Sequence, residues 1–348
     1  NCVYVEKLRY DQDKNIQVKE DDVLVTKDGT IGKVAFVNNV PKKTTLNSGV
    51  FVIRPVHKSY YPRYFYYVLM SEHFKDFLGK LTAGSTISHL YQKDFVHYEF
   101  PLPPTLTEQK VIATALSDVD ALIASLEQTI TKKKAIKQGA MQQLLTPPHK
   151  GGERLPGFEG EWLEKTLGDV GNVKMCKRIF SYQTSKRGDI PFYKIGTFGK
   201  EPDAFISWDL YQEFRTKYSF PKKGYLLISA SGTIGRTVEY LGEDAYYQDS
   251  NIIWIDNDEK LITNKYLDYT LKIIKYNTEG STIKRLYNSI IKSSKISIPP
   301  TLKEQQAIAQ ILSDMDAEIT QLETKKEKYQ AIKQGMMQEL LTGKTRLK

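Results

Sequence analysis

The segment PLPPTLTEQKVIATALSDVDALIASLEQTITKKKAIKQGAMQQLLT at residues 101–146 returns without a gap at residues 297–342. The second copy reads SIPPTLKEQQAIAQILSDMDAEITQLETKKEKYQAIKQGMMQELLT, and more than half of the aligned positions are identical. Such self-similarity indicates a duplicated architecture and decides how the rest of the chain is interpreted.

Shorter repeats lie upstream of both copies. AGSTISHLY at 83–91 returns as EGSTIKRLY, and DGTIGK at 28–33 returns as SGTIGR at 231–236. The alignment leaves residues 151–203 without an N-terminal counterpart. We therefore expect a segment of about that length to be missing from the front of the first domain.

The longest repeat predicts two long helices, near 106–145 and 302–341. Each opens with Pro-Pro and a T-x-x-E capping box, Thr105 with Glu108 and Thr301 with Glu304. Apolar residues then alternate by four and three, which is typical of a coiled-coil seam. The seam residues are Ile112, Leu116, Val119, Ile123, Leu126 and Ile130, then Ile308, Leu312, Met315, Ile319, Leu322, Tyr329, Ile332, Met336 and Leu340. Forty helical residues would span roughly 60 Å, enough to separate two domains.

Charge indicates how these helices pair. Acids dominate 105–131 and 303–323, whereas bases dominate 132–137 and 325–348. Antiparallel packing sets each acidic half against a basic half, and parallel packing would oppose like charges. Alternatively, the charges complement each helix's own dipole. We expect the antiparallel pair.

The globular parts predict mixed strands and helices. DDVLVTKDGTIGKVAFV and KKGYLLISASGTIGRTVEY each indicate a strand, a glycine turn and a strand. Further strands are expected at 49–53 and 250–255, and further helices near 62–80 and 264–277. No βαβ regularity appears, so the fold class is α+β. We expect two such domains, separated by a long antiparallel two-helix coiled coil in a pseudo-twofold repeat.

Composition sets the outer limits on function. The 348 residues carry a net charge of +9, which favours a polyanionic partner. Two cysteines and scattered histidines predict neither a disulfide framework nor a metal site. No apolar run approaches a membrane span, and the N-terminus lacks a signal-peptide pattern. We therefore expect a cytoplasmic protein without a membrane partner.

Catalytic motifs are also absent from the sequence. Gly343-Lys344-Thr345 ends like a P-loop, but the first glycine that the motif requires falls at Gln338. The paired glycines of GTIG lie in expected hairpins, so they do not indicate a dinucleotide site. Pro103-Pro104 is followed by threonine, unlike the tetrapeptide of an amino-methyltransferase. We expect no catalytic residue and no cofactor.

The duplicated PPTLTEQKVIATALSDVDALIASLE and AIKQGAMQQLLT segments resemble the specificity subunit of type I restriction-modification systems. The resemblance implies two target recognition domains that each read half of a split double-stranded DNA site. It also implies that the long helices hold the domains apart and dock methyltransferase (modification) subunits, with the restriction/translocase subunit joining through the complex. The implied domains are 1–104 and 147–300, and the implied helical segments are 105–146 and 301–348.

Hydroxyl and basic residues beside the repeated glycines are the candidate DNA contacts. Those of the expected hairpin tips and of the GSTI loops, with one basic stretch, are Lys27, Thr30, Lys33, Ser85, Thr86, His89, Lys177, Arg178, Ser231, Thr233, Arg236, Ser281, Thr282, Lys284 and Arg285. The same residue types also suit turn geometry alone. Positions that differ between the copies, such as His89 against Arg285, are the better candidates for sequence readout.

Other function classes remain open at this stage. One is a nuclease or methyltransferase whose catalytic part lies in the missing front, although about fifty residues would be too short for either. Another is a coiled-coil scaffold that binds only proteins. A duplex DNA titration at two salt concentrations separates these alternatives, because phosphate contacts impose a steep salt dependence.

Overall fold

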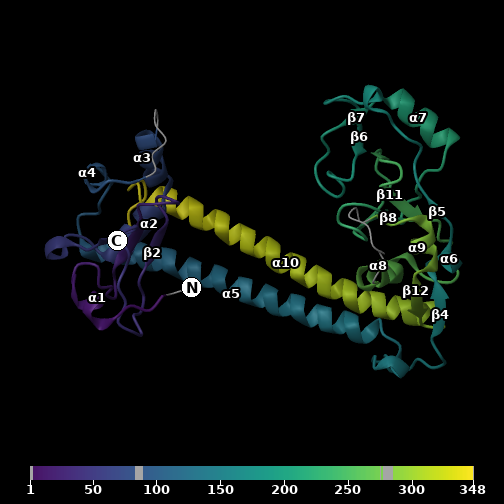
Figure 1. Ribbon diagram of the computed structural model, residues 1–348, viewed down its shortest axis with the longest axis horizontal. Coiled ribbons are helices and arrows are strands. Elements are labelled where there is room, and N and C mark those ends of the chain that lie inside the picture. The colour runs from purple at the N-terminus through teal and green to yellow at the C-terminus, as the bar shows by residue number, and fades with distance from the viewer. Residues whose placement is uncertain (1–2, 83–88, 275, 277–284, 348) are drawn as a thin grey trace. The chain divides into compact units, whose positions relative to one another are not determined.

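The computed structural model describes residues 3–82, 89–274, 276 and 285–347. The chain forms two compact units. Unit 1 comprises residues 1–130 and 321–348, and unit 2 comprises residues 131–320. Each unit therefore contains one globular part and portions of both long helices, which are labelled α5 and α10 in Figure 1.

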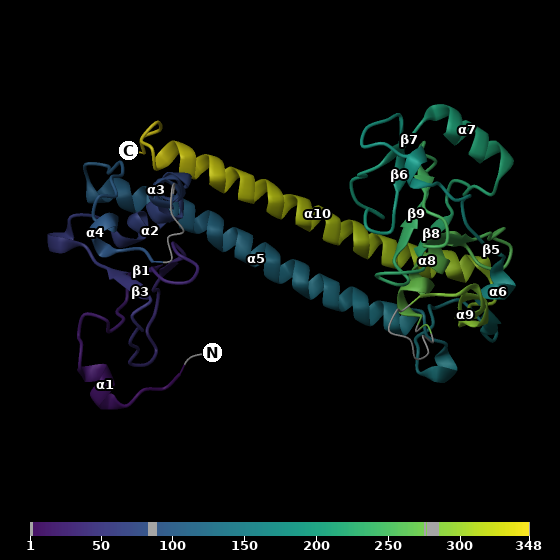
Figure 2. The ribbon, with the colours of Figure 1, turned by 45° about the horizontal axis from the view of Figure 1, so that its top comes forward.

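Unit 1 contains a three-stranded antiparallel sheet in the order β2-β1-β3, with α2 packed over β1 and β2 (Figure 2). Its core joins this sheet to α2, α3 and the ends of the long helices, through side chains such as Val25, Tyr64, Leu116 and Leu340. The elements of the globular part are α1 (Lys7–Asp11), β1 (Val23–Thr26), β2 (Val34–Phe36), β3 (Val50–Ile53), η1 (Val56–Lys58), α2 (Pro62–Met70), α3 (Glu72–Thr82) and α4 (Gln92–Phe95).

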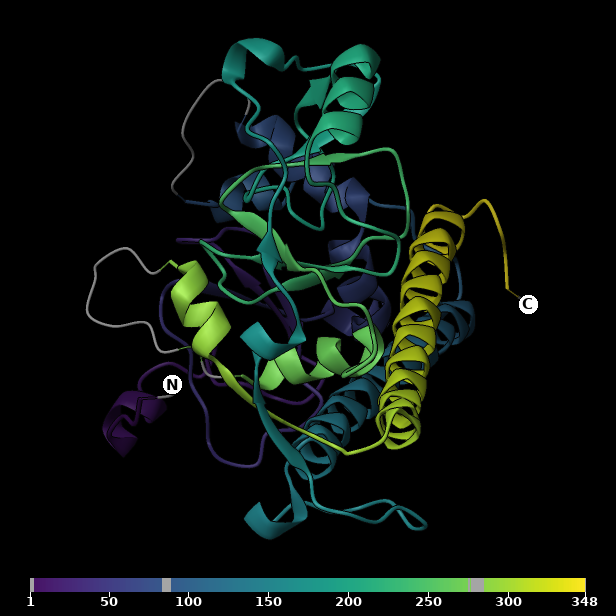
Figure 3. The ribbon, with the colours of Figure 1, turned by 90° about the vertical axis from the view of Figure 1, so that its right-hand side faces the viewer.

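Unit 2 contains a four-stranded sheet in the order β5-β11-β8-β9, a smaller sheet β10-β6-β7, and the pair β12-β4. Figure 3 shows α9 leading through β12 into α10. The elements are η2 (Pro148–Lys150), β4 (Leu163–Thr166), α6 (Leu167–Val170), β5 (Val173–Lys174), η3 (Ser181–Gln183), β6 (Ile190–Tyr193), β7 (Phe205–Ile206), α7 (Trp208–Lys217), β8 (Leu226–Ser229), β9 (Thr237–Glu239), β10 (Tyr246–Tyr247), β11 (Ile252–Ile255), α8 (Asn264–Ile273), α9 (Asn288–Ser293) and β12 (Lys295–Ile298).

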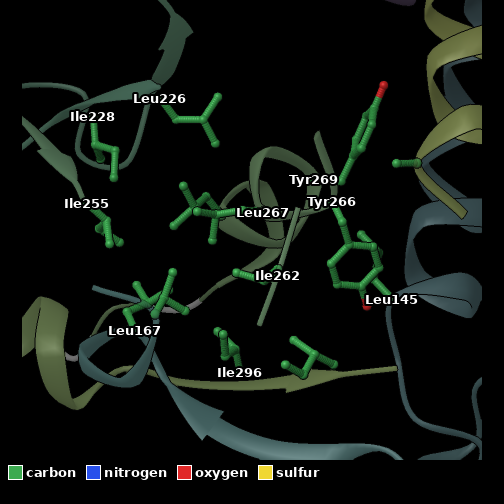
Figure 4. Packing of buried hydrophobic residues seen from close by; sticks show 14 of the residues in the cluster. Leu145, Leu167, Leu226, Ile228, Ile255, Ile262, Tyr266, Leu267, Tyr269 and Ile296 are labelled. Carbon is green, nitrogen blue, oxygen red and sulfur yellow. The ribbon is translucent and has the colours of Figure 1, made fainter. Parts of the chain in front are cut away.

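The two sheets share one plan. Strands β1, β2 and β3 correspond to β8, β9 and β11, with the same antiparallel neighbours. The fourth strand of unit 2, β5, comes from the segment 151–203 that has no counterpart in the first repeat. Behind the sheet, α8 presents Leu267 to Leu226 and Ile228 of β8 and Ile255 of β11, whereas Tyr266 points toward Leu145 (Figure 4). The mixed strand and helix content confirms the predicted class.

Two expected helices differ from the sequence prediction, and the strand expected over 250–255 begins only at Ile252. The single helix expected over 62–80 is two helices, because Ser71 takes an extended conformation with ψ 163° between α2 and α3. The helix expected to reach residue 277 ends with α8 at Ile273. Both helical differences concern helix ends, where local periodicity carries little information.

The long helices span α5 (Leu106–Leu144) and α10 (Leu302–Leu340), which agrees with the predicted bounds within one residue. The predicted capping boxes form only in part. Thr105 Oγ1 and Thr301 Oγ1 accept hydrogen bonds from the backbone N–H groups of Glu108 and Glu304. The two glutamate carboxylates instead bind arginines: Arg346 Nη2 lies 2.6 Å from Glu108 Oε2, and Arg154 Nη2 lies 2.7 Å from Glu304 Oε2.

Ion pairs connect the two helices within each unit. In unit 1, Lys333 lies 2.6 Å from Asp120, and Lys326 lies 3.6 Å from Glu127. In unit 2, Lys133 lies 2.7 Å from Glu318, and Lys137 pairs with Asp316. Residue numbers fall along one helix as they rise along the other, which is the antiparallel direction that the charge halves predict.

The predicted seam is wrong at one position. Ile332 is 40% exposed, whereas its neighbour Lys333 faces α5. Asp120 provides the reason, because it accepts a hydrogen bond from Tyr67 Oη at 2.9 Å and pairs with the Lys333 ammonium. We call this arrangement of a lysine, an aspartate and a tyrosine a Lys-Asp-Tyr joint. It recurs in unit 2, where Tyr269 Oη donates to Asp316 at 2.9 Å and Lys137 pairs with that carboxylate. In both joints the lysine ammonium also lies 5.6 Å from the tyrosine ring centroid.

Candidate nucleic-acid interface

Each unit carries a wide hairpin loop built in the same way. The loops cover 27–33 and 230–236, so the glycine turns expected between the strands are seven-residue loops. A hydroxyl at the end of the first strand ties each loop together. Thr26 Oγ1 donates to the carbonyl of Thr30, and Ser229 Oγ donates to that of Thr233.

The repeated glycines are required by the geometry of these loops. Gly29 and Gly232 have φ values of 67° and 66°, and Gly32 and Gly235 have 80° and 79°. Left-handed backbone favours glycine because other residues carry a Cβ. A Cβ on Gly32 would also lie 2.3 Å from the side chain of Leu78. Turn geometry therefore accounts for the glycines, and DNA contacts must come from the side chains around them.

A returning segment closes each loop. Leu90 N donates to the carbonyl of Lys27, and Leu286 N donates to that of Ala230, both at 2.8 Å. These bonds place His89 opposite Asp28 and Arg285 opposite Ser231 as isolated antiparallel bridges. The hairpin loop and its returning segment thus form the same backbone frame in both units. The pairs His89–Asp28 and Arg285–Ser231 occupy equivalent places in it.

Their side chains behave differently in the two units. His89 Nδ1 pairs with the Asp28 carboxylate at the tip of the first hairpin. Arg285 Nη2 instead donates to the Ser250 carbonyl at 3.0 Å, and Ser231 Oγ meets Asn251 Oδ1 at 2.9 Å. One frame therefore presents an acid–imidazole pair in unit 1 and a guanidinium with a hydroxyl in unit 2.

The turn Asp249-Ser250-Asn251 connects a second predicted residue to this cluster. Arg178 Nε lies 2.8 Å from Asp249 Oδ2, and Ser250 Oγ lies 3.2 Å from the same oxygen. Ser250 has a positive φ of 59°, which turns its carbonyl to Arg285. Arg178, Ser231 and Arg285, far apart in sequence, are thus brought together. The sequence pattern placed residues 250 and 251 in a strand and gave no sign of this turn.

The remaining predicted residues are placed less closely together. Lys27 Nζ lies 5.2 Å from the Phe51 ring centroid, and Thr30 and Lys33 are exposed on the loop. Thr233 is exposed, and Arg236 Nη2 donates to the Gly199 carbonyl at 3.2 Å. Lys177 Nζ lies 5.0 Å from the Tyr218 ring centroid. The predicted contacts Ser85, Thr86, Ser281, Thr282 and Lys284 lie outside the described residues.

Two tyrosines next to the returning segments were missed as candidates. Tyr91 and Tyr287 are 55% and 59% exposed and occupy the same repeat position. Each precedes a short helix but makes no side-chain capping bond. The Tyr91 ring packs against the His89 ring at an interplanar angle of 53°, with centroids 4.6 Å apart. The shared Leu-Tyr after the variable pair is the signal that could have found them.

The described part of the chain offers little for covalent or metal chemistry. No group of three His, Cys, Asp or Glu side chains there could hold a metal ion. Burial raises the pKa of the Cys176 thiol to about 12, so this thiol is protonated at neutral pH. No described helix is long and apolar enough to cross a membrane. The exposed basic and hydroxyl groups on the loops suit hydrogen bonding to an anionic polymer.

Sequence comparison identifies the family. The sequence model described as "Type I restriction modification DNA specificity domain" matches residues 4–138 and 159–334, which is most of the chain. The chain belongs to this family.

Curated relatives carry matching names. A putative type I restriction enzyme specificity subunit of Haemophilus influenzae is 46% identical over 256 residues, covering 73% of this chain and 64% of that protein. The chain thus spans less than two thirds of the length of that relative. A putative type I restriction enzyme MjaX specificity subunit of Methanocaldococcus jannaschii is 28% identical over 99% of this chain and 83% of its own length. These names agree with the expectation of a specificity subunit.

Solved structures show the same fold. The crystal structure of a type I restriction-modification S subunit from M. genitalium aligns with a TM-score of 0.60 at 17% identity, covering 92% of this chain and 83% of that one. A chain from a structure describing assembly of a type I R-M system aligns with a TM-score of 0.56 at 18% identity, covering 94% and 83%. These structures therefore show the fold alone, and the function has to be inferred from the residues of this chain.

Proposed function

We propose that this chain is the sequence-specific DNA-recognition subunit of a type I restriction-modification complex, and that it reads a bipartite, asymmetric site in double-stranded DNA. One observation carries the proposal. The two units share a hairpin loop and a returning segment, yet they present His89 with Asp28 in one and Arg285 with Ser231 in the other. A common frame with different side chains suits two different half-sites.

The chemistry of the second frame favours base readout. An arginine guanidinium can donate two hydrogen bonds to the O6 and N7 atoms of guanine in the major groove. Arg285 is half-buried and anchored by one Nη2 bond to a carbonyl, so its orientation is defined before DNA binds. Lys33 and Arg236, the last residues of the two loops, are suited to phosphate contacts that are independent of sequence.

The length of the helices would set the distance between two recognition domains. We place these domains at 1–104 and 147–300, and the helical segments at 105–146 and 301–348. The segments form an antiparallel two-helix coiled coil in a pseudo-twofold repeat. The duplicated Lys-Asp-Tyr joints support this arrangement, since each binds a globular part to both helices. The spacer of the DNA site then follows from helix length.

The outer faces of the helices would dock methyltransferase subunits, with the restriction/translocase subunit joining through the complex. Ile136 and Ile332 support this, because they occupy the same repeat position and are 47% and 40% exposed. A single exposed isoleucine needs no explanation. Two at equivalent positions fit two equivalent docking sites. Replacing either with glutamate should remove one methyltransferase subunit per complex, measured by mass photometry, and an unchanged stoichiometry would contradict this assignment.

The recognition proposal is tested by replacing Arg285 with alanine in the full-length protein. A guanine contact predicts weaker binding by about 1–3 kcal/mol and relaxed preference at one base of the second half-site. The assay is a competition series with single-base variants of both half-sites. Lys260→Ala is the matched control, because Lys260 is an 86% exposed cation beyond the opposite end of β11.

Each outcome has a distinct meaning. A uniform loss across all sequences, with a salt slope lower by about one, would make Arg285 a phosphate contact. A change confined to the first half-site would refute the assignment of unit 2 to the second. If the wild-type complex binds duplex DNA without a salt slope, the chain is a protein-binding scaffold instead.

A further inference from the structure

Unit 2 exposes a stacked pair of aromatic rings beside its proposed recognition cluster. Phe180 and Tyr182 are 50% and 82% exposed, and their rings lie 5.7 Å apart at an interplanar angle of 8°. Exposed single aromatics are ordinary, but a parallel pair that projects into solvent leaves a large apolar face uncovered. We name residues 177–187 the aromatic finger.

The finger is held in shape by its own hydrogen bonds. Phe180 N donates to Gln183 Oε1 and Gln183 N donates to the Phe180 carbonyl, both at 2.9 Å. Thr184 Oγ1 donates to the Ser181 carbonyl at 2.8 Å. At its end, Ser185 exchanges two backbone bonds with Phe205 on β7. The backbone that carries the rings is therefore ordered before any partner arrives, which lowers the entropy cost of binding.

Charge around the rings indicates the class of partner. In sequence, Lys177 and Arg178 precede the two aromatic residues and Lys186 and Arg187 follow them, and all four cations are exposed. It contains no acidic residue. A protein partner with an apolar pocket would not require four cations around two rings. A polyanion whose subunits have flat apolar faces satisfies both features, and nucleic acid is such a polymer.

The finger is continuous with the proposed DNA-reading cluster. Arg178, two residues before Phe180, pairs with Asp249, and the adjoining Ser250 carbonyl accepts from Arg285. A duplex read by Arg285 would thus run close to the finger. Residues 177–187 belong to the segment that has no sequence counterpart in the first repeat.

We infer that Phe180 and Tyr182 form a wedge that stacks on a base at an opened step of the duplex beside the second half-site. The inference rests on the proposed function. Proteins that insert apolar side chains between base pairs unstack one step, and the flanking cations hold the phosphates on either side. Stacking on an aromatic ring does not depend on the identity of the base, so the wedge adds affinity without adding a base to the recognition sequence.

The experiment measures DNA binding by the complete methyltransferase complex containing Tyr182→Ala. Loss of one stacking contact predicts about tenfold to hundredfold weaker binding to the specific duplex. Phe180→Leu is the second variant, because leucine keeps apolar bulk at this half-buried position but removes the flat ring. Leu241→Ala is the matched control, since Leu241 is a 65% exposed apolar side chain elsewhere in unit 2 and should leave binding unchanged.

A mismatch scan locates the wedge. A mismatch lowers the cost of unstacking, so the wild-type complex should bind more tightly when it lies at one step beside the second half-site. This gain should disappear in Tyr182→Ala and persist in Leu241→Ala. Wild-type binding with an unchanged Tyr182→Ala profile would refute the wedge alone. Loss of methyltransferase assembly with intact DNA binding would show that the finger contacts protein. Failure of the wild-type complex to bind duplex DNA would refute the proposed function as well.

Discussion

Removal of Arg154 should destabilise unit 2 more than any other single ion-pair change described in this chain. Its guanidinium binds Glu304 through two bonds, Nε to Oε1 at 3.0 Å and Nη2 to Oε2 at 2.7 Å. The Glu304 side chain is completely buried, and that of Arg154 is only 20% exposed. Arg154 Nη2 also donates to the Glu159 carbonyl at 2.7 Å, which fixes the loop before β4.

The size of the effect follows from the carboxylate left behind. Breaking a buried ion pair by removing one partner costs about 3–5 kcal/mol, because the remaining charge stays out of water without compensation. For a unit of this size each kcal/mol lowers the melting temperature by about 2–4 °C. Arg154→Ala should therefore melt roughly 6–20 °C below the wild type.

A double-mutant cycle by calorimetry tests the reasoning. Arg154→Ala with Glu304→Gln should recover most of the lost stability, because no charge is then left buried. Arg346→Ala is the internal comparison, since Arg346 binds the corresponding Glu108 in unit 1 but is itself 55% exposed. Its loss should be smaller. Equal melting temperatures for Arg154→Ala and the wild type, or a double variant less stable than Arg154→Ala, would refute the argument.

Three further predictions concern the helices, the hairpin loop and acid stability. Cysteines at positions 120 and 333 should be joined efficiently by a short bifunctional thiol reagent, because Asp120 pairs with Lys333; efficient linking of a cysteine at position 120 to a cysteine at position 316 instead would indicate parallel helices. Gly32→Ala should destabilise unit 1 far more than an alanine at an exposed helical position, because its φ is 80° and a Cβ would strike a leucine of α3; circular-dichroism melting is the check, and equal losses would contradict the clash. The pKa of Asp256 lies below its ordinary value, chiefly because the lysine of β5 hydrogen-bonds its carboxylate, with the hydroxyl of Tyr225 next. This stabilisation is complete above the ordinary carboxyl pKa of about 4 and is lost as pH falls through the lowered value, so Asp256→Asn should flatten the acid side of the stability–pH curve; an unaltered curve would contradict the assignment.

The sequence by itself determined the long helices and the duplication. The bounds of α5 and α10 agree with the pattern because Pro-Pro, the threonine N-cap and the apolar repeat all act within a few residues. The antiparallel direction could also be predicted, because the acidic and basic halves of each helix are visible in the sequence. The ion pairs between the helices join an acidic half to a basic half, as in Lys326–Glu127 and Lys133–Glu318. Strands followed from alternation and glycine position for the same local reason.

Tertiary structure decided which side chains meet. Lys333 rather than Ile332 faces α5. An α-helix drifts from a strict seven-residue repeat, and the Asp120 carboxylate, held by a hydrogen bond from Tyr67, binds the Lys333 ammonium. Glu304 takes Arg154 instead of closing its own capping box, because the chain after α5 returns to the start of α10.

The candidate site shows the same division. The variable positions at His89 and Arg285 could be chosen from the repeat, but their surroundings could not. Arg178 meets the Arg285 cluster only through the turn at 249–251, whose conformation depends on a positive φ and on neighbours from other strands. Local sequence specifies which elements form, because helix caps and apolar periods are short-range. The contacts that would bind DNA depend on segments more than a hundred residues apart, so only the packed fold brings them together.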